Sequence, residues 1–296
     1  MAGDPDLQGR PADQGSPIRL TTRRAALTLL AAAPFAAAAA LADAPVEVAY
    51  GAHPLQRLDI YSQAGLAAAP MLLFVHGGAW TTGDKQGVGA LPGYARRHDF
   101  LLASAGYRLG AGAEPAAEDV AAAAAWLLDN GARFGGDPKR LFLMGHSAGG
   151  HLAALIAIDP RYLAAYGHAP ADLAGVIGVD GAGYDAATDL AAMSRLMRPS
   201  DIAAWTHAFG DHAAALSPTR LVRPGGHYPP FLLFYTDHPG ARLFCLELAA
   251  KLKAAGGAAA VVDAPGKSHD EINTDLGLPG DPAGERAADF VTTGRL

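Results

Sequence analysis

The chain has 296 residues, of which 50% are hydrophobic and 18% are charged, a composition that excludes a disordered or highly charged protein. Its formal net charge is −6 and it contains no polybasic block, so a nucleic-acid partner is not expected. The single cysteine, Cys245, excludes an internal disulfide and a cysteine-rich zinc site.

The first 42 residues have the pattern of an export signal. Arg23 and Arg24 form a basic pair, the almost wholly apolar stretch 25–41 follows, and small residues stand at Ala40 and Ala42. Such a pattern is typical of secretory signals, and paired arginines indicate the twin-arginine route. The alternatives are an uncleaved membrane anchor and an Ala-rich helix, although a bilayer span needs roughly 20 apolar residues. We therefore expect a disordered leader with a signal cleaved after Ala42, an exported (periplasmic or secreted) protein, and no stable membrane span after cleavage.

Downstream of this signal, apolar runs typical of strands alternate with segments of helical spacing. Strands are expected at residues 56–61, 71–75, 100–105, 141–144, 176–179, 231–235 and 258–262, and helices at 118–130, 151–158, 241–255 and 283–291. This alternation predicts an α/β fold, with a mostly parallel central sheet covered by helices on both faces. The stretch from about 186 to 228 interrupts the rhythm, and we expect a small cap insertion over the carboxyl edge of the sheet, where such folds bind ligands. Residues 43–296 are thus predicted to form one domain.

A candidate nucleophile lies in the pentapeptide Gly145-His146-Ser147-Ala148-Gly149, which fits G-x-S-x-G. It stands between a predicted strand and a predicted helix, the context in which this pattern has meaning. A serine on such a turn is held in a strained conformation with its hydroxyl exposed, and the glycines avoid collisions with neighbouring backbone. The helix that follows directs its first amides at the site, which favours negative charge there.

Candidate oxyanion donors lie in His76-Gly77-Gly78-Ala79-Trp80, directly after the strand expected at 71–75. Acyl transfer develops an oxyanion that needs preorganised N–H donors, and a glycine pair lets backbone amides approach it. We expect one donor from Gly78, with Gly77 and Ala79 as close competitors, and the other from Ala148 after the nucleophile. Without the serine motif downstream, this segment would be interpreted as an ordinary glycine-rich turn.

The acid and the base are expected from the chain order Ser, then Asp or Glu, then His. Asp237 and His269 each follow a predicted strand, so both belong to the sheet edge that carries Ser147. An imidazole can take the serine proton and return it to the leaving group, while a buried carboxylate fixes its tautomer. Asp263 and Asp270 are also near His269, but they are too close to it along the chain for the usual geometry.

These motifs together resemble those of α/β-hydrolases of the esterase/lipase group. The resemblance runs from about Val46 to the C-terminus. The motif HGG followed by x-W is similar to the motif of the branch that contains kynurenine formamidases and small-ester carboxylesterases. The resemblance rests on the following segments: His76–Trp80, Gly106–Leu109, Phe134–Pro138, Gly145–His151, and the pair Asp237 and His269. The resemblance implies that Ser147 is the nucleophile, His269 the base and Asp237 the acid, with Gly77, Gly78 and Ala148 in the oxyanion hole.

Four further side chains are expected to border the substrate pocket: Trp80, His146, Tyr184 and His238. The predicted function is a serine hydrolase that cleaves small or medium acyl esters through an acyl-enzyme, with a small-molecule ester as its partner. Arylformamide hydrolysis and peptide cleavage use the same residues and stay open, as does an inactive binding protein that retains the hydrolase fold. No cofactor is expected, and the sequence contains no H-E-x-x-H or cysteine pair for a metal. The oligomeric state is not predicted.

Overall fold

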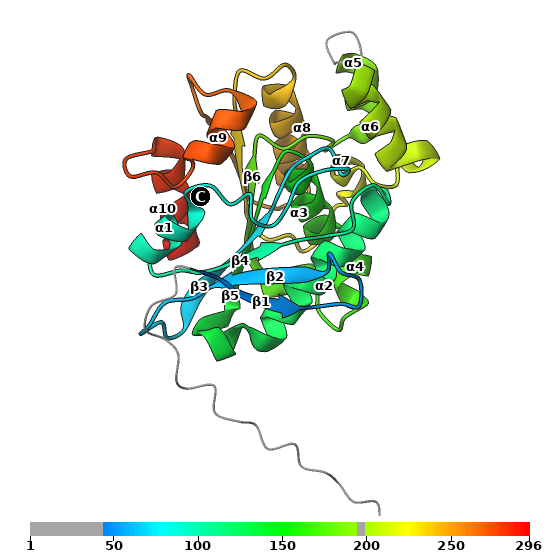
Figure 1. Cartoon of the computed structure of the whole chain (residues 1–296). Coiled ribbons are helices and arrows are strands. Elements are labelled where there is room, and N and C mark those ends of the chain that lie inside the picture. The colour runs from blue at the N-terminus through cyan, green and yellow to red at the C-terminus, as the bar shows by residue number, and fades with distance from the viewer. Residues whose placement is uncertain (1–43, 194–198) are drawn as a thin grey trace, which may run out of the picture. The chain divides into compact units, whose positions relative to one another are not determined.

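The computed structural model of the protein describes residues 44–193 and 199–296 (Figure 1). The expected export signal of residues 1–42 lies outside the described residues. Within these two ranges, no helix combines the length and the apolar character needed to cross a bilayer.

An eight-stranded sheet forms the centre of the fold, in the order β1-β2-β4-β3-β5-β6-β7-β8. The strands are β1 (Val46–Ala49), β2 (Arg57–Tyr61), β3 (Ala69–Val75), β4 (Leu101–Ala105), β5 (Gly136–His146), β6 (Leu173–Val179), β7 (Phe231–Tyr235) and β8 (Ala259–Asp263). The pairs β1–β2 and β2–β4 are antiparallel and all the others are parallel. The carboxyl ends of β3 and of β5 to β8 therefore share one edge of the sheet.

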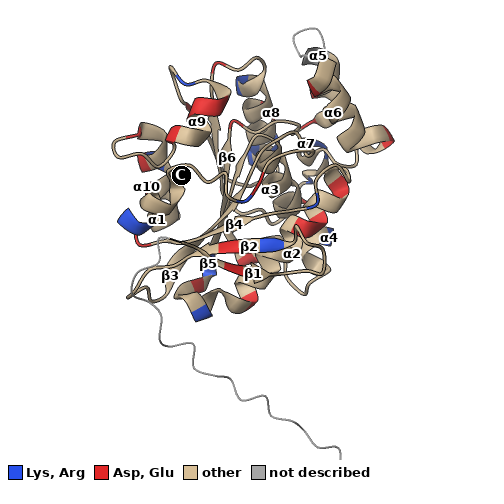
Figure 2. Cartoon of the chain, in the orientation of Figure 1, with Lys and Arg blue, Asp and Glu red and all other residues tan. Residues whose placement is uncertain are grey.

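Helices cover both faces of this sheet (Figure 1). They are α1 (Leu91–Arg97), α2 (Ala113–Asn130), η1 (Gly131–Phe134), α3 (Ala148–Ile158), α4 (Pro160–Ala164), η2 (Pro170–Asp172), α5 (Ala186–Met193), α6 (Pro199–Phe209), η3 (Gly210–His212), α7 (Pro218–Leu221), α8 (Ala241–Ala254), α9 (His269–Asp275) and α10 (Pro282–Thr293). Acidic and basic residues are interspersed over these helices (Figure 2). The expectation of a mostly parallel sheet with helices on both faces is confirmed.

Alternation along the strands divides the interior into two cores. In β3, Met71, Leu73 and Val75 join the core beneath α2, α3 and α8, whereas Leu72 and Phe74 join the core beneath α1 and α10. Every residue of β3 is buried, because successive side chains of a strand point to opposite faces and both faces are covered. This explains the unbroken apolar run that predicted the strand.

Two strands differ most from the expectation, and helices α1, α4 and α9 were not expected. Strand β5 begins at Gly136, five residues before the apolar run, because its first part is polar and partly exposed. Strand β1 was not expected, since it is a short and mostly exposed edge strand with little apolar pattern.

Between β6 and β7, where a cap insertion was predicted, the chain forms α5, α6, η3 and α7. Helix α6 contributes side chains to the pocket described next.

Candidate active site

Ser147 occupies a sharp turn between β5 and α3. Its backbone has φ 53° and ψ −120°, a left-handed conformation that a residue with a side chain adopts only under constraint. A Cβ on Gly145 would lie 2.2 Å from the carbonyl oxygen of Gly149, and one on Gly149 would lie 2.0 Å from that of Val75. Only glycine fits at these two positions, as the sequence pattern predicted.

The backbone of Ser147 is anchored to the neighbouring strand. Its N–H donates to the carbonyl of Val179 (3.1 Å), and its own carbonyl accepts from Gly150 (2.9 Å) and Ala182 (3.2 Å). These bonds hold the serine in the strained conformation, with its side chain at the wall of a pocket.

Backbone amides of two segments meet at the same place. Gly78, Ala79 and Ala148 line the pocket beside Ser147. Gly78 (φ 108°) and Ala79 (φ 50°) both have positive φ, and the carbonyl of Gly78 accepts from the amides of Thr81 and Thr82. Among the described residues, no acceptor is bound by the N–H groups of Gly78, Ala79 and Ala148. These three amides are therefore available to an incoming oxyanion.

Gly77, the fourth expected residue of the oxyanion segment, lies behind the pocket wall. A Cβ there would lie 3.0 Å from Nδ1 of His146 and 3.1 Å from Cβ of Ser147. Its role is to let the loop pack closely on the serine turn. Tyr107 stabilises this loop from below by donating from its hydroxyl to the carbonyl of His76 at 2.9 Å.

The carboxylate that contacts His269 belongs to Asp180, so the prediction of Asp237 is wrong. Nδ1 of His269 lies 2.6 Å from Oδ2 of Asp180, whereas Asp237 is exposed and makes no hydrogen bond to His269 within the described ranges. Asp180 directly follows β6, while Asp237 follows β7, the next strand of the sheet. Asp180 carries the same signal as Asp237, because it is an acidic residue that follows an apolar strand and lies between Ser147 and His269 in the chain.

Thr236, at the end of β7, holds the Asp180 carboxylate in place. Its backbone N–H donates to Oδ1 (2.9 Å) and its hydroxyl donates to Oδ2 (2.8 Å). The Asp180 side chain is 0% exposed. Burial alone would raise the pKa of Asp180, but the hydrogen bonds from His269 and Thr236 outweigh it and hold that pKa below its usual value. The carboxylate is therefore ionised at neutral pH and faces an imidazole.

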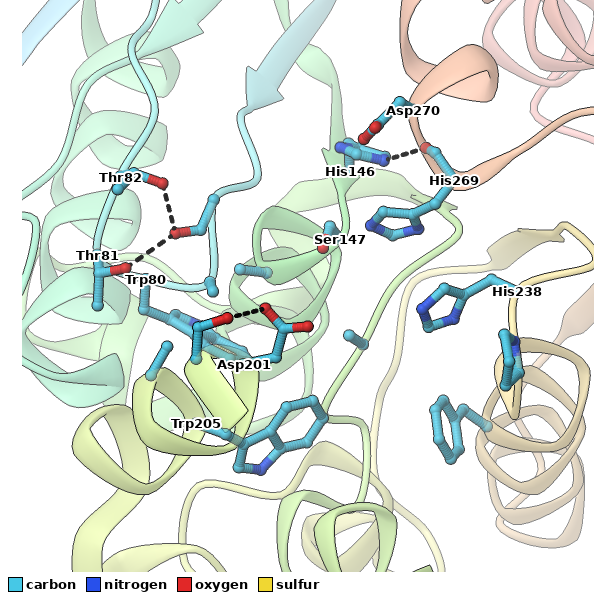
Figure 3. A pocket seen from close by; sticks show the side chains of 18 residues that line it. Trp80, Thr81, Thr82, His146, Ser147, Asp201, Trp205, His238, His269 and Asp270 are labelled. Carbon is cyan, nitrogen blue, oxygen red and sulfur yellow. Dashed lines mark hydrogen bonds between the residues drawn. The ribbon is translucent and has the colours of Figure 1, made fainter. Parts of the chain in front are cut away.

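His269 lies next to Ser147 across the pocket (Figure 3). No hydrogen bond joins the Ser147 hydroxyl to the His269 ring in the part of the chain that the structure describes. Because Nδ1 of His269 is bound to Asp180, Nε2 is the nitrogen left for the serine. Catalytic hydrogen bonds often tighten only when substrate is bound.

Two other imidazoles flank the His269 ring. The ring centroids of His146 and His238 lie 4.6 Å and 4.9 Å from that of His269. Nε2–H of His146 donates to the carbonyl of His269 at 2.9 Å, which fixes the start of α9. Burial, with a smaller contribution from His269, lowers the pKa of His146 to about 4, so this ring is neutral and serves as a positioning group. The same two causes lower the pKa of His238.

The pocket in front of Ser147 has a volume of about 770 Å³. Trp80, His146 and His238 line it as expected, together with Trp205, Phe244, Asp201 and Asp270. In Figure 3, Asp201 lies beside Trp205 and Asp270 lies beside His146. The indole N–H of Trp80 donates to Nδ1 of His151 at 3.2 Å, which holds the tryptophan in the wall.

Tyr184 does not line this pocket, so the expectation for it is wrong. It is 1% exposed, and its hydroxyl is packed where a Cβ on Gly178 or Gly181 would come within 2.3 Å. Small residues at these positions admit the phenol into the core, a consequence of packing that the sequence pattern could not indicate.

Fold and site together define the class of protein. A strained serine turn after β5, a histidine after β8 and unbonded amides after β3 on a mostly parallel sheet are the features of an α/β-hydrolase of the esterase/lipase group. More particularly, residues 58–235, over half of the chain, match the BD-FAE family model, and the chain belongs to this family.

Individual relatives agree with this class. The chain is similar to the isoprenylcysteine α-carbonyl methylesterase of Arabidopsis thaliana (35% identity over 117 residues, 38% of this chain and 27% of that protein). It is also similar to esterase LipC of Mycobacterium tuberculosis (36% over 129 residues, 40% and 31%). The chain thus spans about a quarter to a third of the length of these curated relatives.

Solved structures share the fold over most of the chain. A truncated carbohydrate esterase from gut microbiota matches with a TM-score of 0.68 at 20% identity, covering 84% of this chain and 94% of that one. Esterase 2 of Thermogutta terrifontis in its butyrate-bound form matches with a TM-score of 0.64 at 19% identity, with the same coverage.

Proposed function

We propose that this protein is a carboxylic ester hydrolase that uses Ser147 as its nucleophile. The observation that carries the proposal is the convergence of Ser147, His269 and the ionised Asp180 beside three unbonded amides. The names of the relatives, which include esterases and carboxylic ester hydrolases, support the same activity.

In the first half of the reaction, the Ser147 hydroxyl attacks the ester carbonyl while Nε2 of His269 takes its proton. The resulting imidazolium lies 2.6 Å from the Asp180 carboxylate, whose charge stabilises it. The carbonyl oxygen becomes an oxyanion and accepts hydrogen bonds from the amides of Ala148 and of Gly78 or Ala79, each such donor contributing about 2.7–4 kcal/mol. His269 then returns the proton to the departing alcohol, which leaves an acyl group on Ser147.

In the second half, water enters and gives a proton to Nε2 of His269 as its oxygen attacks the acyl carbonyl. The same amides receive the second oxyanion, and collapse of the intermediate releases the acid and restores the Ser147 hydroxyl. No step needs a cofactor.

We infer a preference for small or medium acyl groups from the pocket wall. Trp80 and Trp205 pack edge to face with ring centroids 5.4 Å apart, and Trp80 and Phe244 are buried in the wall. These rigid aromatic side chains close one side of a pocket of about 770 Å³.

A fluorophosphonate probe followed by peptide mass spectrometry tests the nucleophile. We expect one adduct, on Ser147, that is lost in Ser147→Ala and in His269→Ala and retained in Ser62→Ala, a control at an exposed serine remote from the pocket. Absence of labelling in folded protein would favour the inactive binding protein instead.

A second experiment compares turnover rates on three kinds of substrate, to separate ester from formamide and peptide cleavage. The substrates are p-nitrophenyl acetate, butyrate and octanoate, then N-formylkynurenine, and then aminoacyl arylamides. We expect the two short esters to react fastest.

Export remains a separate proposal, supported by the basic pair Arg23-Arg24 and the apolar stretch that follows. Expression of the full chain in a bacterium with a twin-arginine system should yield a periplasmic form that begins after Ala42. Replacement of both arginines by lysine should leave the protein in the cytoplasm with its N-terminus intact. N-terminal sequencing of both fractions gives the answer, and processing that is indifferent to the replacement would contradict this route.

A further inference from the structure

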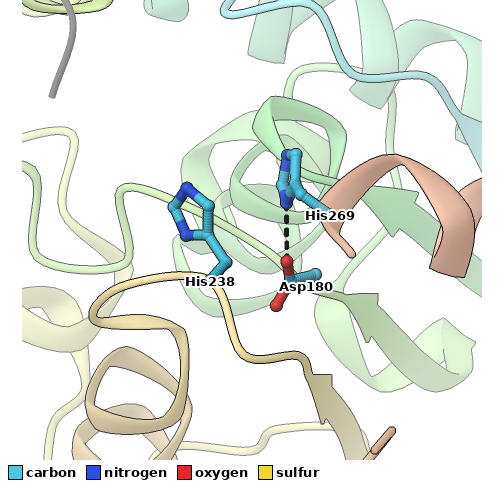
Figure 4. Close-up of side chains that lie close together, drawn as sticks. All are labelled: Asp180, His238 and His269. Atoms are coloured by element: carbon cyan, nitrogen blue, oxygen red, sulfur yellow. Dashed lines mark hydrogen bonds and ion pairs between the residues drawn. The ribbon is translucent and has the colours of Figure 1, made fainter. Parts of the chain in front are cut away.

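Three metal-ligating side chains that follow three strands meet at the wall of the pocket. Asp180 follows β6, His238 follows β7 and His269 begins α9 after β8. Each offers one ligand atom, and these atoms all lie within 4.8 Å of one another (Figure 4). Two imidazoles and one carboxylate form a ligand set suited to zinc and related divalent transition ions. The sequence shows no metal motif because these residues are far apart along the chain.

The spacing requires only small side-chain movements to accept an ion. Zinc binds imidazole nitrogen and carboxylate oxygen at about 2.0–2.2 Å in tetrahedral geometry, so its ligand atoms stand roughly 3.3–3.5 Å apart. The distance between Nδ1 of His269 and Oδ2 of Asp180, 2.6 Å, would have to increase slightly. His238 lies on the loop between β7 and α8 and is exposed, so a rotation of its side chain towards the other two displaces no core residue.

The surroundings already orient one ligand and give access to the others. Thr236 holds both oxygens of Asp180 through its N–H and its hydroxyl, the kind of outer contact that tunes metal ligands. His238 and His269 both line the pocket, which supplies a route for an ion from solvent and room for water as the fourth ligand.

We propose that Asp180, His238 and His269 form a reversible inhibitory site for Zn²⁺. This inference rests on the proposed function, because the ion would occupy the base of the same catalytic group. Zinc forms bonds to Nδ1 of His269, to one oxygen of Asp180 and to a nitrogen of His238, and water completes the tetrahedron.

Inhibition follows from the position of one proton. In the active protein the neutral His269 ring carries its proton on Nδ1, facing Asp180, and offers the lone pair of Nε2 to Ser147. When Nδ1 binds zinc, the single ring proton must move to Nε2, which then donates and can no longer accept the serine proton. The ion thus replaces the hydrogen bond between His269 and Asp180, and neither substrate nor redox change is needed.

The test is a zinc titration of the chelator-stripped protein, with p-nitrophenyl butyrate turnover and a competing chromophoric chelator as two readouts. We expect one zinc per chain, inhibition reversed by EDTA, and no comparable effect of Mg²⁺, which prefers oxygen ligands. In His238→Ala, half-inhibition relative to the zinc-free activity of that variant should need at least about 10-fold more zinc, since even outer contacts of metal ligands contribute 10–100-fold. The control is His53→Ala, an exposed histidine between β1 and β2 at the opposite edge of the sheet.

Equal zinc sensitivity of His238→Ala and the parent protein would overturn the proposal, as would a lack of inhibition when zinc is bound. If His238→Ala does not fold, His238→Gln provides the same comparison with a polar side chain of similar size. Absence of turnover without zinc would instead refute the proposed esterase function. In that event, zinc binding that is weakened in His238→Ala and unchanged in His53→Ala would still support the metal site.

Discussion

The assignment of Asp180 leads to a sharp prediction for Asp180→Asn. The replacement keeps the size of the side chain, and its amide oxygen can still accept from the N–H of Thr236, as Oδ1 does now at 2.9 Å. The amide nitrogen would stand where Oδ2 lies 2.6 Å from Nδ1 of His269. Because that nitrogen donates, Nδ1 would have to accept, and the ring proton would move to Nε2, where it blocks proton transfer from Ser147.

The expected loss is large because the variant has the wrong tautomer and lacks the buried charge. In the Ser-His-Asp template, the same change of the acid lowers kcat about 10⁴-fold, which corresponds to about 5.4 kcal/mol in the barrier at 1.36 kcal/mol per factor of ten. The Asp180 side chain is 0% exposed, so solvent does not screen its charge, and we expect a loss of this order. Asp237 is exposed, and Asp237→Asn should stay within about 3-fold of the parent.

The assay is p-nitrophenyl butyrate hydrolysis by both variants at pH 7.5, with thermal unfolding to verify the fold. Thr236→Val provides an intermediate case, because it keeps the backbone donor and removes only the hydroxyl that bonds Oδ2 at 2.8 Å. The loss of one such bond to an ionised group is worth about 1.5–3 kcal/mol, or roughly 10- to 160-fold in kcat at 1.36 kcal/mol per factor of ten. If Asp237→Asn lost activity and Asp180→Asn kept it, the acid assignment drawn from the structure would be refuted.

Three further predictions concern stability. Gly149→Ala places a Cβ 2.0 Å from the carbonyl of Val75 and should lower the free energy of unfolding by at least about 1–3 kcal/mol in urea titrations. The control is Gly93→Ala in α1, whose Cβ would meet nothing nearer than 3.6 Å and which should be neutral or stabilising. Equal effects of the two substitutions would contradict the close packing of the serine turn. Tyr184→Phe removes a buried hydroxyl that has no partner in the described part of the chain, so the melting temperature should rise, and a fall would indicate a partner for the hydroxyl. Burial raises the pKa of Asp189 to about 8. The folded protein therefore holds a proton on this carboxyl that the unfolded chain releases near pH 4. Because of this difference, the free energy of unfolding falls as the pH rises from about 4 to 8. Asp189→Asn should remove this fall and be more stable than the parent at pH 8 by at least about 1 kcal/mol; parallel stability curves for the two proteins would argue against it.

The sequence predicted the elements that have strong apolar patterns and the parts of the candidate site whose geometry is local. The runs at 71–75 and 231–235 became β3 and β7 because both faces of the sheet are buried. The Ser147 turn could be predicted because five consecutive residues determine it. The acid could not, because Asp180 and Asp237 end neighbouring strands, and only the three-dimensional path of the loop after β8 decides which carboxylate His269 meets. Tyr184 was misplaced for a related reason, since its burial depends on glycines of other segments.

Because the acid follows β6 and not β7, the proposed ester cleavage and the proposed inhibition by zinc depend on different residues of the segment after β7. Within the segment after β7, Thr236 alone bonds the carboxylate, so the side chain at position 238 can change without removing a hydrogen bond to Asp180. In the proposed zinc site, the residue at position 238 would then set how strongly zinc inhibits ester cleavage. Descendants of one ancestor could therefore diverge in metal tolerance while retaining the same chemistry.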